Sequence, residues 1–464
     1  MPLALKSNCS IIKDGKSIFL VMNGYRRPLT TKEALFLTLL NGTRSLDEVY
    51  DIFLELKIGD EKRRNDTINI IKNNYRLYLT ENSIEQTTKK YSPNEFVMAG
   101  NNKLSLNRYP VPTALMFIVT INCDKACRYC FVNAPTGISN ENLLPYSRVK
   151  QLLDEAASMG VGDITYSGGE PFLRHDIFDI MEYAALLGLR NRVTTKHYLN
   201  EDQIKRLKQI SLLSPLNLSI SYDINHNEIA SIMVDKKDHA LNIDCVVRSL
   251  IKNEIDFCVQ PVLTGLSFPF FKKFLNYLQD IGVKKAIISR YYKTSGRTDD
   301  RFDLKQDQWQ EAVGWFNDYH MIVEPFEDLC KDDYRNIKID EWRDKQGKKE
   351  RLGKYYGCVE TRRTLIIAPD GKAILCNCLP NRTDFVYGDL SKTSIADVWD
   401  SEERKAIVIP PRDKFRETNC FNCDSYEDCS LKMACYKNSL EVGNSIYTLL
   451  PGITNYCDIL KGNM

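Results

Sequence analysis

Residues 113–130 read TALMFIVTINCDKACRYC and join an apolar run to three closely spaced cysteines. The run TALMFIVT has the length and composition of a buried strand in a parallel sheet. Cys123, Cys127 and Cys130 follow at the spacing Cys-x3-Cys-x2-Cys. A structural zinc site needs four closed ligands, whereas three thiolates on one loop suit a four-iron cluster with one open iron. The stretch therefore predicts a strand that carries a cluster-binding loop at its carboxyl end.

Beyond this strand the sequence alternates between strand-length and helix-length patterns. Further strands are expected at 163–167, 192–196, 216–221, 257–263 and 285–292, and helices at 147–160, 176–188, 201–210, 240–253, 271–282 and 306–319. Strand–helix units in tandem predict a parallel sheet. Because there are six units, we expect an α/β fold with a partial (β/α)6 TIM barrel. Its chemistry should lie at the carboxyl ends of the strands.

Residues 1–85 predict a smaller separate domain. Two apolar runs flank Asp14-Gly15, which is a hairpin signal. Helical patterns follow, one with Thr31 as the expected N-cap and Gly42 as its stop, one opened by Ser45, and one at 60–74. A strand is expected at 75–80. A hairpin, three helices and a strand in this order predict a winged-helix-like domain.

The remaining boundaries follow from changes in composition. Residues 86–110 are polar and are interpreted as a linker to the barrel, 111–325, and the charged segment 326–357 as a connection. Residues 358–464 are rich in cysteine and short of long helical patterns. We expect metal clusters, rather than a large apolar core, to organise this last domain.

The composition narrows the functional classes. A net charge of +2 gives no global indication of binding to nucleic acid or to an anionic membrane. There is no apolar run of transmembrane length and no secretory signal pattern, so a cytoplasmic protein is expected. Fifteen cysteines would then be reduced, which favours metal or iron–sulfur ligation over disulfides. The isolated Cys9, Cys245, Cys258 and Cys330 are expected to be small buried apolar residues.

The cysteine trio resembles the signature of the radical S-adenosylmethionine (SAM) superfamily. Tyr129 precedes the last cysteine, and the second expected strand ends in SGGEP at 167–171, similar to the glycine-rich methionine-binding element of that family. The alternative is a zinc knuckle beside an unrelated glycine turn. The resemblance implies a SAM-binding [4Fe-4S] cluster on the trio. It also implies cofactor contacts from Tyr129, Ser167, Gly168, Gly169, Glu170, Pro171, Ser221 and Asp223. The third strand end, VTTKHY, departs from the family pattern, so Lys196 and His197 receive no role.

The C-terminal cysteines resemble the SPASM extension of radical SAM enzymes, which carries two auxiliary [4Fe-4S] clusters. The resemblance places Cys420, Cys423, Cys429 and Cys457 on one cluster and Cys358, Cys376 and Cys435 on the other. Either Cys378 or a substrate thiolate completes the second set. The implied total is three clusters. Five residues separate Cys429 from Cys435, where relatives usually have three, so the local geometry departs from the pattern. A pair of structural zinc sites is the alternative.

The N-terminal unit resembles the recognition elements of enzymes that modify ribosomally made peptides, which bind a leader segment as an added strand. Taken together, the chain resembles thioether-forming peptide maturases of the sactisynthase and ranthipeptide type. This implies a precursor peptide bound through its leader and a flavodoxin- or ferredoxin-type electron donor. A sulfatase-maturating enzyme is disfavoured by the added N-terminal unit.

Two other functions stay open at this point. One is a carbon–carbon crosslinking or epimerising peptide maturase, which leaves substrate thiols free. The other is a non-catalytic, redox-sensing winged-helix regulator on DNA. Against the regulator, basic residues are mixed with acidic ones, as in GDEKRRND, instead of forming a uniform stripe, and a sensor does not need SGGEP.

Overall fold

The computed structural model of the chain describes residues 2–81, 111–326, 363–377 and 385–422, together with Tyr436 and Leu440. Short gaps within these ranges fall at 7–8, 15–16, 23–24, 57–58, 138–140, 160, 294–296, 409–410, 417 and 419. The expected linker 86–110 and nearly all of the expected connection 326–357 lie outside the described residues. Within the described part, no helix is long and apolar enough to cross a membrane.

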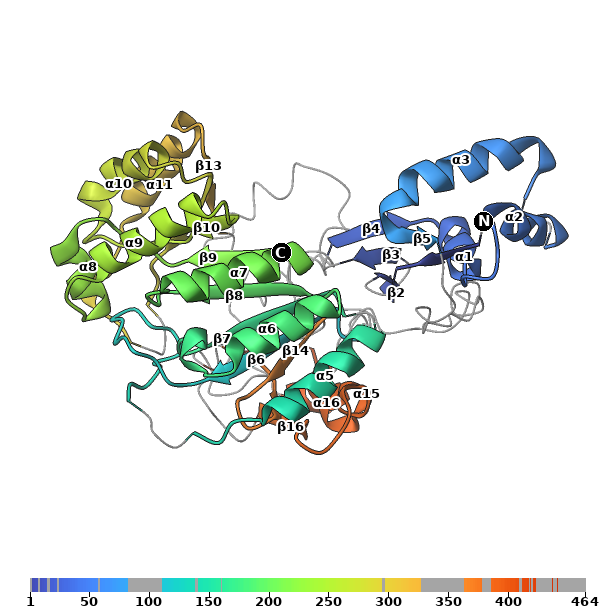
Figure 1. Ribbon diagram of the computed structural model, residues 1–464. Helices are drawn as coiled ribbons and strands as arrows, with labels where there is room; N and C mark the ends of the chain where they lie inside the picture. The colour runs from blue at the N-terminus through green and yellow to red at the C-terminus, as the bar shows by residue number, and fades with distance from the viewer. Residues whose placement is uncertain are drawn as a thin grey trace.

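The centre of the molecule is a curved, mostly parallel sheet (Figure 1). Among the described residues its order is β11-β12-β10-β9-β8-β7-β6-β14-β15-β16, and β13 pairs with β12. The strands are β6 (Ala114–Thr120), β7 (Asp163–Gly168), β8 (Arg190–Thr195), β9 (Leu216–Ile220), β10 (Phe257–Val259), β11 (Val262–Leu263), β12 (Lys285–Arg290), β13 (Ile322–Pro325), β14 (Thr364–Ile367), β15 (Lys372–Ile374) and β16 (Val386–Asp389). The predicted fold class is confirmed, because β6, β7, β8, β9, β10 and β12 are parallel neighbours in chain order.

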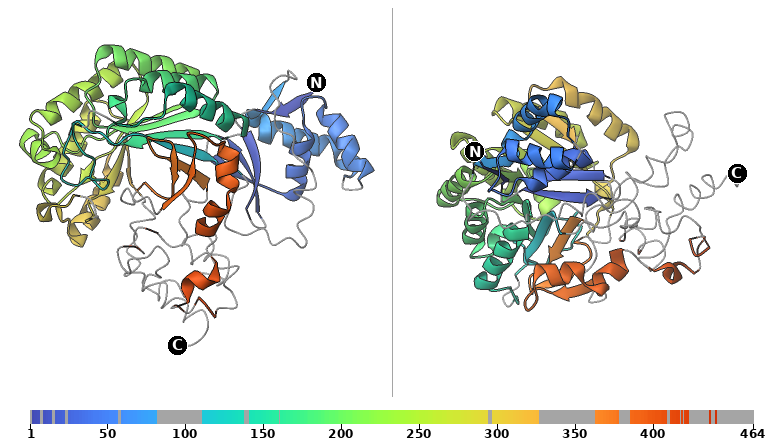
Figure 2. Two further views of the ribbon diagram at one scale, coloured as in Figure 1. Left: turned by 90° about the horizontal axis from the view of Figure 1, so that it is seen from below. Right: turned by 90° about the vertical axis from the view of Figure 1, so that its right-hand side faces the viewer.

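Helices follow the strands and cover the outer side of the sheet, as Figure 2 shows at the left. They are α5 (Tyr146–Met159), α6 (Ile177–Leu186), α7 (Glu201–Leu213), α8 (Asn227–Val234), α9 (His239–Lys252), α10 (Phe268–Asp280) and α11 (Gln306–Trp315). In α5 the residues Val149, Leu152, Leu153 and Ala156 are buried, which is the apolar stripe of an amphipathic helix. The eight-residue helix α8 was not predicted, because its pattern is too short to stand out.

The first part of the C-terminal region extends the central sheet. Strand β14 pairs in parallel with β6 from Thr364 opposite Ala114 to Ile367 opposite Phe117. Helices α15 (Ile395–Asp400) and α16 (Glu402–Val408) follow, and Leu365, Ile367 and Trp399 join the main apolar core. The expectation that clusters rather than an apolar core organise 358–464 is therefore wrong for residues 364–399.

Helix α5 also anchors this C-terminal part through polar contacts. Arg148 donates from Nε to the carbonyl oxygen of Leu390 at 2.8 Å and from Nη2 to that of Thr393 at 2.7 Å. The backbone N–H of Ile395 donates to Glu155 Oε2 at 2.7 Å. Neither pairing has a local sequence signal, since the partners lie about 240 residues apart.

The N-terminal unit consists of β1 (Leu3–Leu5), β2 (Cys9–Asp14), β3 (Ser17–Met22), β4 (Tyr25–Leu29), α1 (Thr31–Leu39), α2 (Leu46–Glu55), α3 (Arg64–Tyr75) and β5 (Leu79–Glu81) (Figure 1). The expected hairpin of β2 and β3 and the three expected helices are present, but β1 and β4 were not predicted. The strand expected at 75–80 begins only at Leu79, because α3 extends to Tyr75 and a 3-10 helix spans Arg76–Tyr78. Strands β2, β3 and β4 form an antiparallel sheet, and β1 pairs with β5. The unit has its own apolar core, although Ile12 and Val21 belong to the core of the main sheet.

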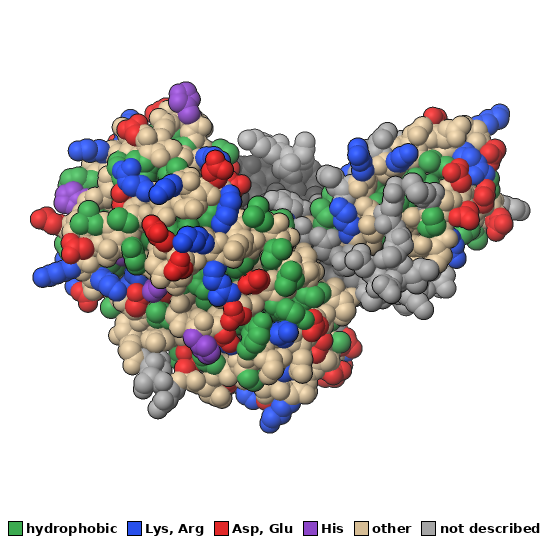
Figure 3. Space-filling view, viewed as in Figure 1, with side chains coloured by type: hydrophobic (Ala, Val, Ile, Leu, Met, Phe, Trp, Pro, Cys, Tyr) green, Lys and Arg blue, Asp and Glu red, His purple; other side chains and the backbone are tan. Residues whose placement is uncertain are grey.

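The helix starts in this unit show one correct and one wrong N-cap. Ser45 caps α2 and forms a capping box with Glu48, as predicted. Thr30, and not Thr31, caps α1, because its side chain accepts from the backbone N–H of Glu33. Figure 3 shows basic and acidic side chains interspersed on the visible face of the unit.

Candidate functional site

The three cysteines of the trio lie on the loop that follows β6. Cys127 is buried, and Cys123 and Cys130 are half-buried. The loop closes on itself, since the N–H of Cys123 donates to the carbonyl oxygen of Pro135 at 2.9 Å. The N–H of Ala134 donates to Cys130 Sγ at 3.5 Å, so one backbone amide is aimed at a sulfur atom. The loop is thus a folded turn held by its own hydrogen bonds.

The donor chemistry of the loop fits an iron–sulfur cluster. Among the described residues, no three His, Cys, Asp or Glu side chains form a single-ion site. In a four-iron cluster, however, each thiolate binds a different iron. Burial, with smaller contributions from Asp223 and the other two thiols, raises the pKa of the Cys127 thiol to about 12, although the charge of Lys196 opposes the shift. Thiolates are the ligating form, so cluster binding here would release protons.

Two glycines bring the end of β7 against the start of the cysteine loop. A Cβ on Gly168 would lie 2.0 Å from the carbonyl oxygen of Thr120, and one on Gly169 would lie 2.0 Å from that of Asn122. Gly168 also has φ 131°, a conformation that side chains rarely adopt. The backbone N–H of Gly169 donates to Thr120, and that of Glu170 donates to Asn122, both at 2.9 Å. The glycine pair therefore allows direct backbone contact between the two predicted motifs.

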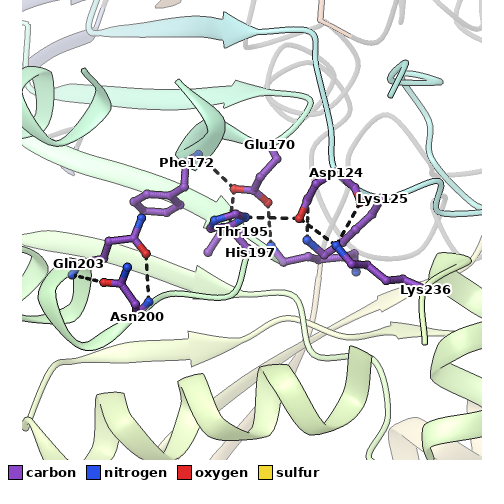
Figure 4. A network of polar contacts seen from close by, with 10 residues as sticks. Asp124, Lys125, Glu170, Phe172, Thr195, His197, Asn200, Gln203 and Lys236 are labelled. Carbon is purple, nitrogen blue, oxygen red and sulfur yellow. Dashed lines mark hydrogen bonds and ion pairs between the residues drawn. The ribbon is translucent and has the colours of Figure 1, made fainter. Parts of the chain in front are cut away.

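Glu170 is buried where β7, β8 and the cysteine loop meet (Figure 4). Its Oε1 accepts from Thr195 Oγ1 at 2.7 Å and from the N–H of Phe172 at 3.2 Å, and its Oε2 accepts from the N–H of Lys196 at 3.1 Å. Pro171 follows as the first residue of the 3-10 helix Pro171–Leu173. Burial raises the pKa of the Glu170 carboxyl despite these hydrogen bonds.

Tyr129 lies at the carboxyl ends of β8 and β9. Its hydroxyl donates to Asp223 Oδ2 and accepts from Lys196 Nζ at 2.6 Å. Lys196 Nζ also lies 2.9 Å from Asp223 Oδ2. Burial alone would raise the pKa of the Asp223 carboxyl, but the charge of Lys196 and three hydrogen bonds lower it. Ser221 is half-buried beside this group, and its N–H donates to the carbonyl oxygen of Thr195 at 2.8 Å.

Asp124, which follows Cys123 in the cysteine loop, lies close to three basic side chains (Figure 4). Its carboxylate lies 2.7 Å from Lys125 Nζ, 3.3 Å from Lys236 Nζ and 3.5 Å from His197 Nδ1. Burial opposes ionisation of Asp124, yet the contacts with His197 and Lys125 lower the pKa of its carboxyl. These contacts hold the loop against the end of β8 and the turn after α8.

The structure brings together the predicted residues of both barrel motifs, and it adds residues that sequence reasoning missed. Those missed are Lys125, Thr195, Lys196, His197 and Arg297. The unusual VTTKHY at the third strand end was the one available signal for three of them. No sequence signal indicated a role for Arg297, because its hydrogen-bond partners lie more than 160 residues away in the chain.

The C-terminal cysteines are described only in part. Cys376 follows β15 and is half-buried, and Cys420 is buried. Cys358, Cys378, Cys423, Cys429, Cys435 and Cys457 lie outside the described residues. Of the isolated cysteines, Cys9 is buried and Cys258 half-buried, whereas Cys245 is exposed, so the expectation of burial is wrong there. Cys330 lies outside the described residues.

Comparisons with known families identify both domain types. The model of the Radical SAM superfamily matches residues 117–303, and the model of SPASM, an iron–sulfur cluster-binding domain, matches residues 358–429. The chain therefore contains a radical SAM domain followed by a SPASM domain, as the motifs indicated. The first match spans β6 to the segment after β12, and thus includes the cysteine loop and SGGEP.

Individual relatives are more distant. Fe-coproporphyrin III synthase of Methanosarcina barkeri is 32% identical over 111 residues, which cover 24% of this chain and 27% of that protein. PqqA peptide cyclase of Xanthomonas campestris is 29% identical over 115 residues, covering 25% and 30%. The chain thus matches less than a third of the length of either relative.

Solved structures of one other protein are similar along nearly the whole chain. Streptococcus suis SuiB bound to its precursor peptide SuiA covers 97% of this chain and 99% of its own, with a TM-score of 0.71 and 16% identity. At this identity the similarity demonstrates a shared fold.

Proposed function

We propose that the chain is a radical SAM maturase that installs thioether crosslinks in a cysteine-containing, ribosomally synthesised precursor peptide. The main support for a peptide substrate is the fold that this chain shares with SuiB over 97% of its length, because that SuiB structure contains a bound precursor peptide. The two sequence relatives are named for a porphyrin and for a peptide, so sequence similarity alone does not select the substrate.

The cysteine loop and the strand ends around it form the proposed reaction site. Cys123, Cys127 and Cys130 would hold the cluster, and the segment Ser167–Pro171 with Tyr129 and Ser221 would hold the cofactor. When bound, the cluster and SAM supply a 5′-deoxyadenosyl radical that abstracts a hydrogen atom from a substrate carbon. The protein holds the reactants at the carboxyl ends of the parallel strands and excludes water there.

The N-terminal unit is the proposed leader-binding element. In its three-stranded sheet β2 and β4 form the two edges. An extended peptide adds to such an edge through main-chain hydrogen bonds. Because Ile12 and Val21 of β2 and β3 join the core of the main sheet, a leader bound here would be held at a fixed distance from the barrel.

Exposed aromatic side chains near the site are consistent with a peptide substrate. Phe131 on the cysteine loop is 43% exposed, Tyr198 after β8 is 52% exposed, and Tyr292 after β12 is 37% exposed. All three follow carboxyl ends of parallel strands, which meet at one edge of a sheet. An extended segment with apolar side chains would cover such surface.

The thioether assignment is supported by the auxiliary cysteines. The set Cys358, Cys376 and Cys435 leaves one position for Cys378 or for a substrate thiolate. These cysteines would hold an auxiliary cluster, which would supply an acceptor for the one electron released when a substrate sulfur bonds to a substrate carbon radical. A flavodoxin- or ferredoxin-type donor would supply the electron that starts each turnover.

Anaerobic turnover with a cognate precursor peptide tests the proposal. Each thioether should remove two hydrogens by mass and one alkylatable thiol. A carbon–carbon crosslink, the alternative reaction, would remove the hydrogens and leave every thiol. Epimerisation would change neither. Failure to form any 5′-deoxyadenosine would refute the enzymatic proposal and favour an iron–sulfur regulator.

A further inference from the structure

A closed triangle of hydrogen bonds joins three segments of the site. Lys196 from the end of β8 donates to Tyr129 of the cysteine loop, and both donate to Asp223 after β9. Lys196 Nζ also lies 5.0 Å from the centre of the Tyr129 ring, within reach of a cation–π contact. The Tyr129 ring also packs against Phe302 in an edge-to-face arrangement, with 6.2 Å between the ring centroids.

The acceptor positions of Asp223 are largely occupied within the protein. Oδ2 accepts from both the Tyr129 hydroxyl and Lys196 Nζ, and Oδ1 accepts from the backbone N–H of Val262 at 3.0 Å. The side chain of Asp223 is only 1% exposed. A carboxylate used in this way fixes its neighbours and offers little to a ligand.

The triangle is also balanced in charge. One ammonium group and one carboxylate share a buried site, with the side chain of Lys196 15% exposed. Breaking such a pair by removing one partner leaves an uncompensated buried charge, whereas removing both does not. The two residues should therefore behave as a unit in substitution experiments.

We infer that Lys196 and Asp223 are positioning residues, which together fix the Tyr129 ring on the cysteine loop. Asp223 then acts through Tyr129, which differs from the direct cofactor contact that the family resemblance implies for it. Lys196, which had no predicted role, neutralises Asp223 and orders Tyr129. The inference rests on the proposed function only in naming SAM as the molecule beside Tyr129.

Four variants of the full chain test the inference. They are Lys196→Met, Asp223→Asn, the double variant with both changes, and Lys285→Met as a control. Lys285 Nζ lies 2.9 Å from Glu324 Oε2 in an exposed ion pair between β12 and β13. Lys285 is the first residue of β12, so it lies at the opposite end of the strand from the carboxyl ends that carry the site. Two quantities are measured, the thermal unfolding midpoint without cofactor and the SAM affinity of the reconstituted protein by equilibrium dialysis.

Both single variants should lower the unfolding midpoint by about 5 °C or more and weaken SAM binding at least about tenfold. The double variant should regain most of the midpoint loss, because no buried charge is left unpaired, but its SAM affinity should stay low, because Tyr129 has then lost both charged partners. The control should match the wild type in both quantities. If Asp223→Asn and the double variant lose SAM affinity equally while Lys196→Met retains it, Asp223 contacts the cofactor directly and the inference is wrong. Additive midpoint changes, with no recovery in the double variant, would also overturn it.

The two readouts separate this inference from the proposed function. A wild-type protein that binds no SAM would refute the proposed function, yet the midpoints would still report whether Lys196 and Asp223 act as a unit. A wild type that binds SAM but shows no recovery in the double variant would refute the inference alone.

Discussion

Arg297 Nη2 donates a hydrogen bond to the carbonyl oxygen of Ala134 at 2.6 Å and so ties the segment after β12 to the cysteine loop. The same guanidinium reaches the carbonyl oxygen of Cys127 at 3.4 Å, and the backbone N–H of Arg297 donates to that of Cys130 at 3.0 Å. Arg297 therefore contacts the loop at two of its three cysteines and just beyond them. No other described segment outside the loop holds its backbone at so many points.

We expect Arg297→Lys to weaken retention of the cluster on the trio by about tenfold or more, as for other groups that support metal ligands. Lysine keeps the charge but cannot span two carbonyl groups. Arg301→Lys is the control, since Arg301 is 52% exposed and pairs with Asp299. The readout is the SAM-responsive electron paramagnetic resonance (EPR) signal after gel filtration. Equal signals in both variants would show that Arg297 does not support the loop.

The two backbone contacts beside Gly169 predict a strong steric effect. Gly169→Ala would place a methyl group 2.0 Å from the carbonyl oxygen of Asn122, so β7 and the cysteine loop must separate. We expect a loss of at least about 1–3 kcal/mol in unfolding free energy, together with loss of SAM binding. Gly314→Ala, with nothing within 4 Å of its added methyl group, should be neutral or stabilising. Equal stability of the two variants in urea unfolding would contradict the contact.

Glu33 makes the stability of α1 dependent on pH. Its carboxylate accepts from the N–H and hydroxyl of Thr30 at 2.8 Å and from the Tyr75 hydroxyl at 2.7 Å. Burial would raise the pKa of this carboxyl, but the hydrogen bonds lower it. A lowered pKa in the folded state stabilises the fold above the unfolded value, about 4.3, and this contribution is lost as the pH falls through the folded value.

Glu33→Gln should therefore cost about 1 kcal/mol of unfolding free energy at pH 7, and the cost should shrink below about pH 4. Urea unfolding at both pH values measures it. Glu55→Gln, an exposed change at the end of α2, should show no such pH dependence. A cost for Glu33→Gln that is the same at both pH values would exclude the ionised carboxylate as its source.

The parallel sheet was predictable because its strands are apolar runs and its helices have regular apolar stripes. The pairing of β14 with β6 was not, since Thr364 and Ala114 are 250 residues apart and no local pattern links them. The cysteine trio and SGGEP were predictable as motifs because their spacing is local. Lys196 and Arg297 were not, because their roles depend on partners that only the fold brings near.

The N-terminal unit shows the same division. Its apolar patterns located the hairpin and three helices, with Thr31 predicted in place of Thr30 as one N-cap. The short strands β1 and β4 were missed, and most of the strand expected at 75–80 is helical. That Ile12 and Val21 pack into the main core could not be inferred, because both faces of an apolar hairpin look alike in sequence.

Replacing Cys123, Cys127 and Cys130 together by alanine should lower the iron content from about twelve to about eight atoms per chain. The proposed auxiliary clusters would use other cysteines and should persist. Formation of 5′-deoxyadenosine should fall to background. Iron analysis and chromatography of the reaction measure both. An unchanged rate of SAM cleavage would refute the assignment of the trio, and a stable value near four irons with bound zinc would refute the auxiliary clusters.

The most direct test of the account is EPR spectroscopy of the reduced, reconstituted protein with and without SAM. Binding of the cofactor to the open iron of the cluster on Cys123, Cys127 and Cys130 should shift that cluster's signal and leave the auxiliary signals in place. The shift should be absent in the triple alanine variant. A wild-type spectrum that does not change when SAM is added would contradict the proposed site and the function built on it.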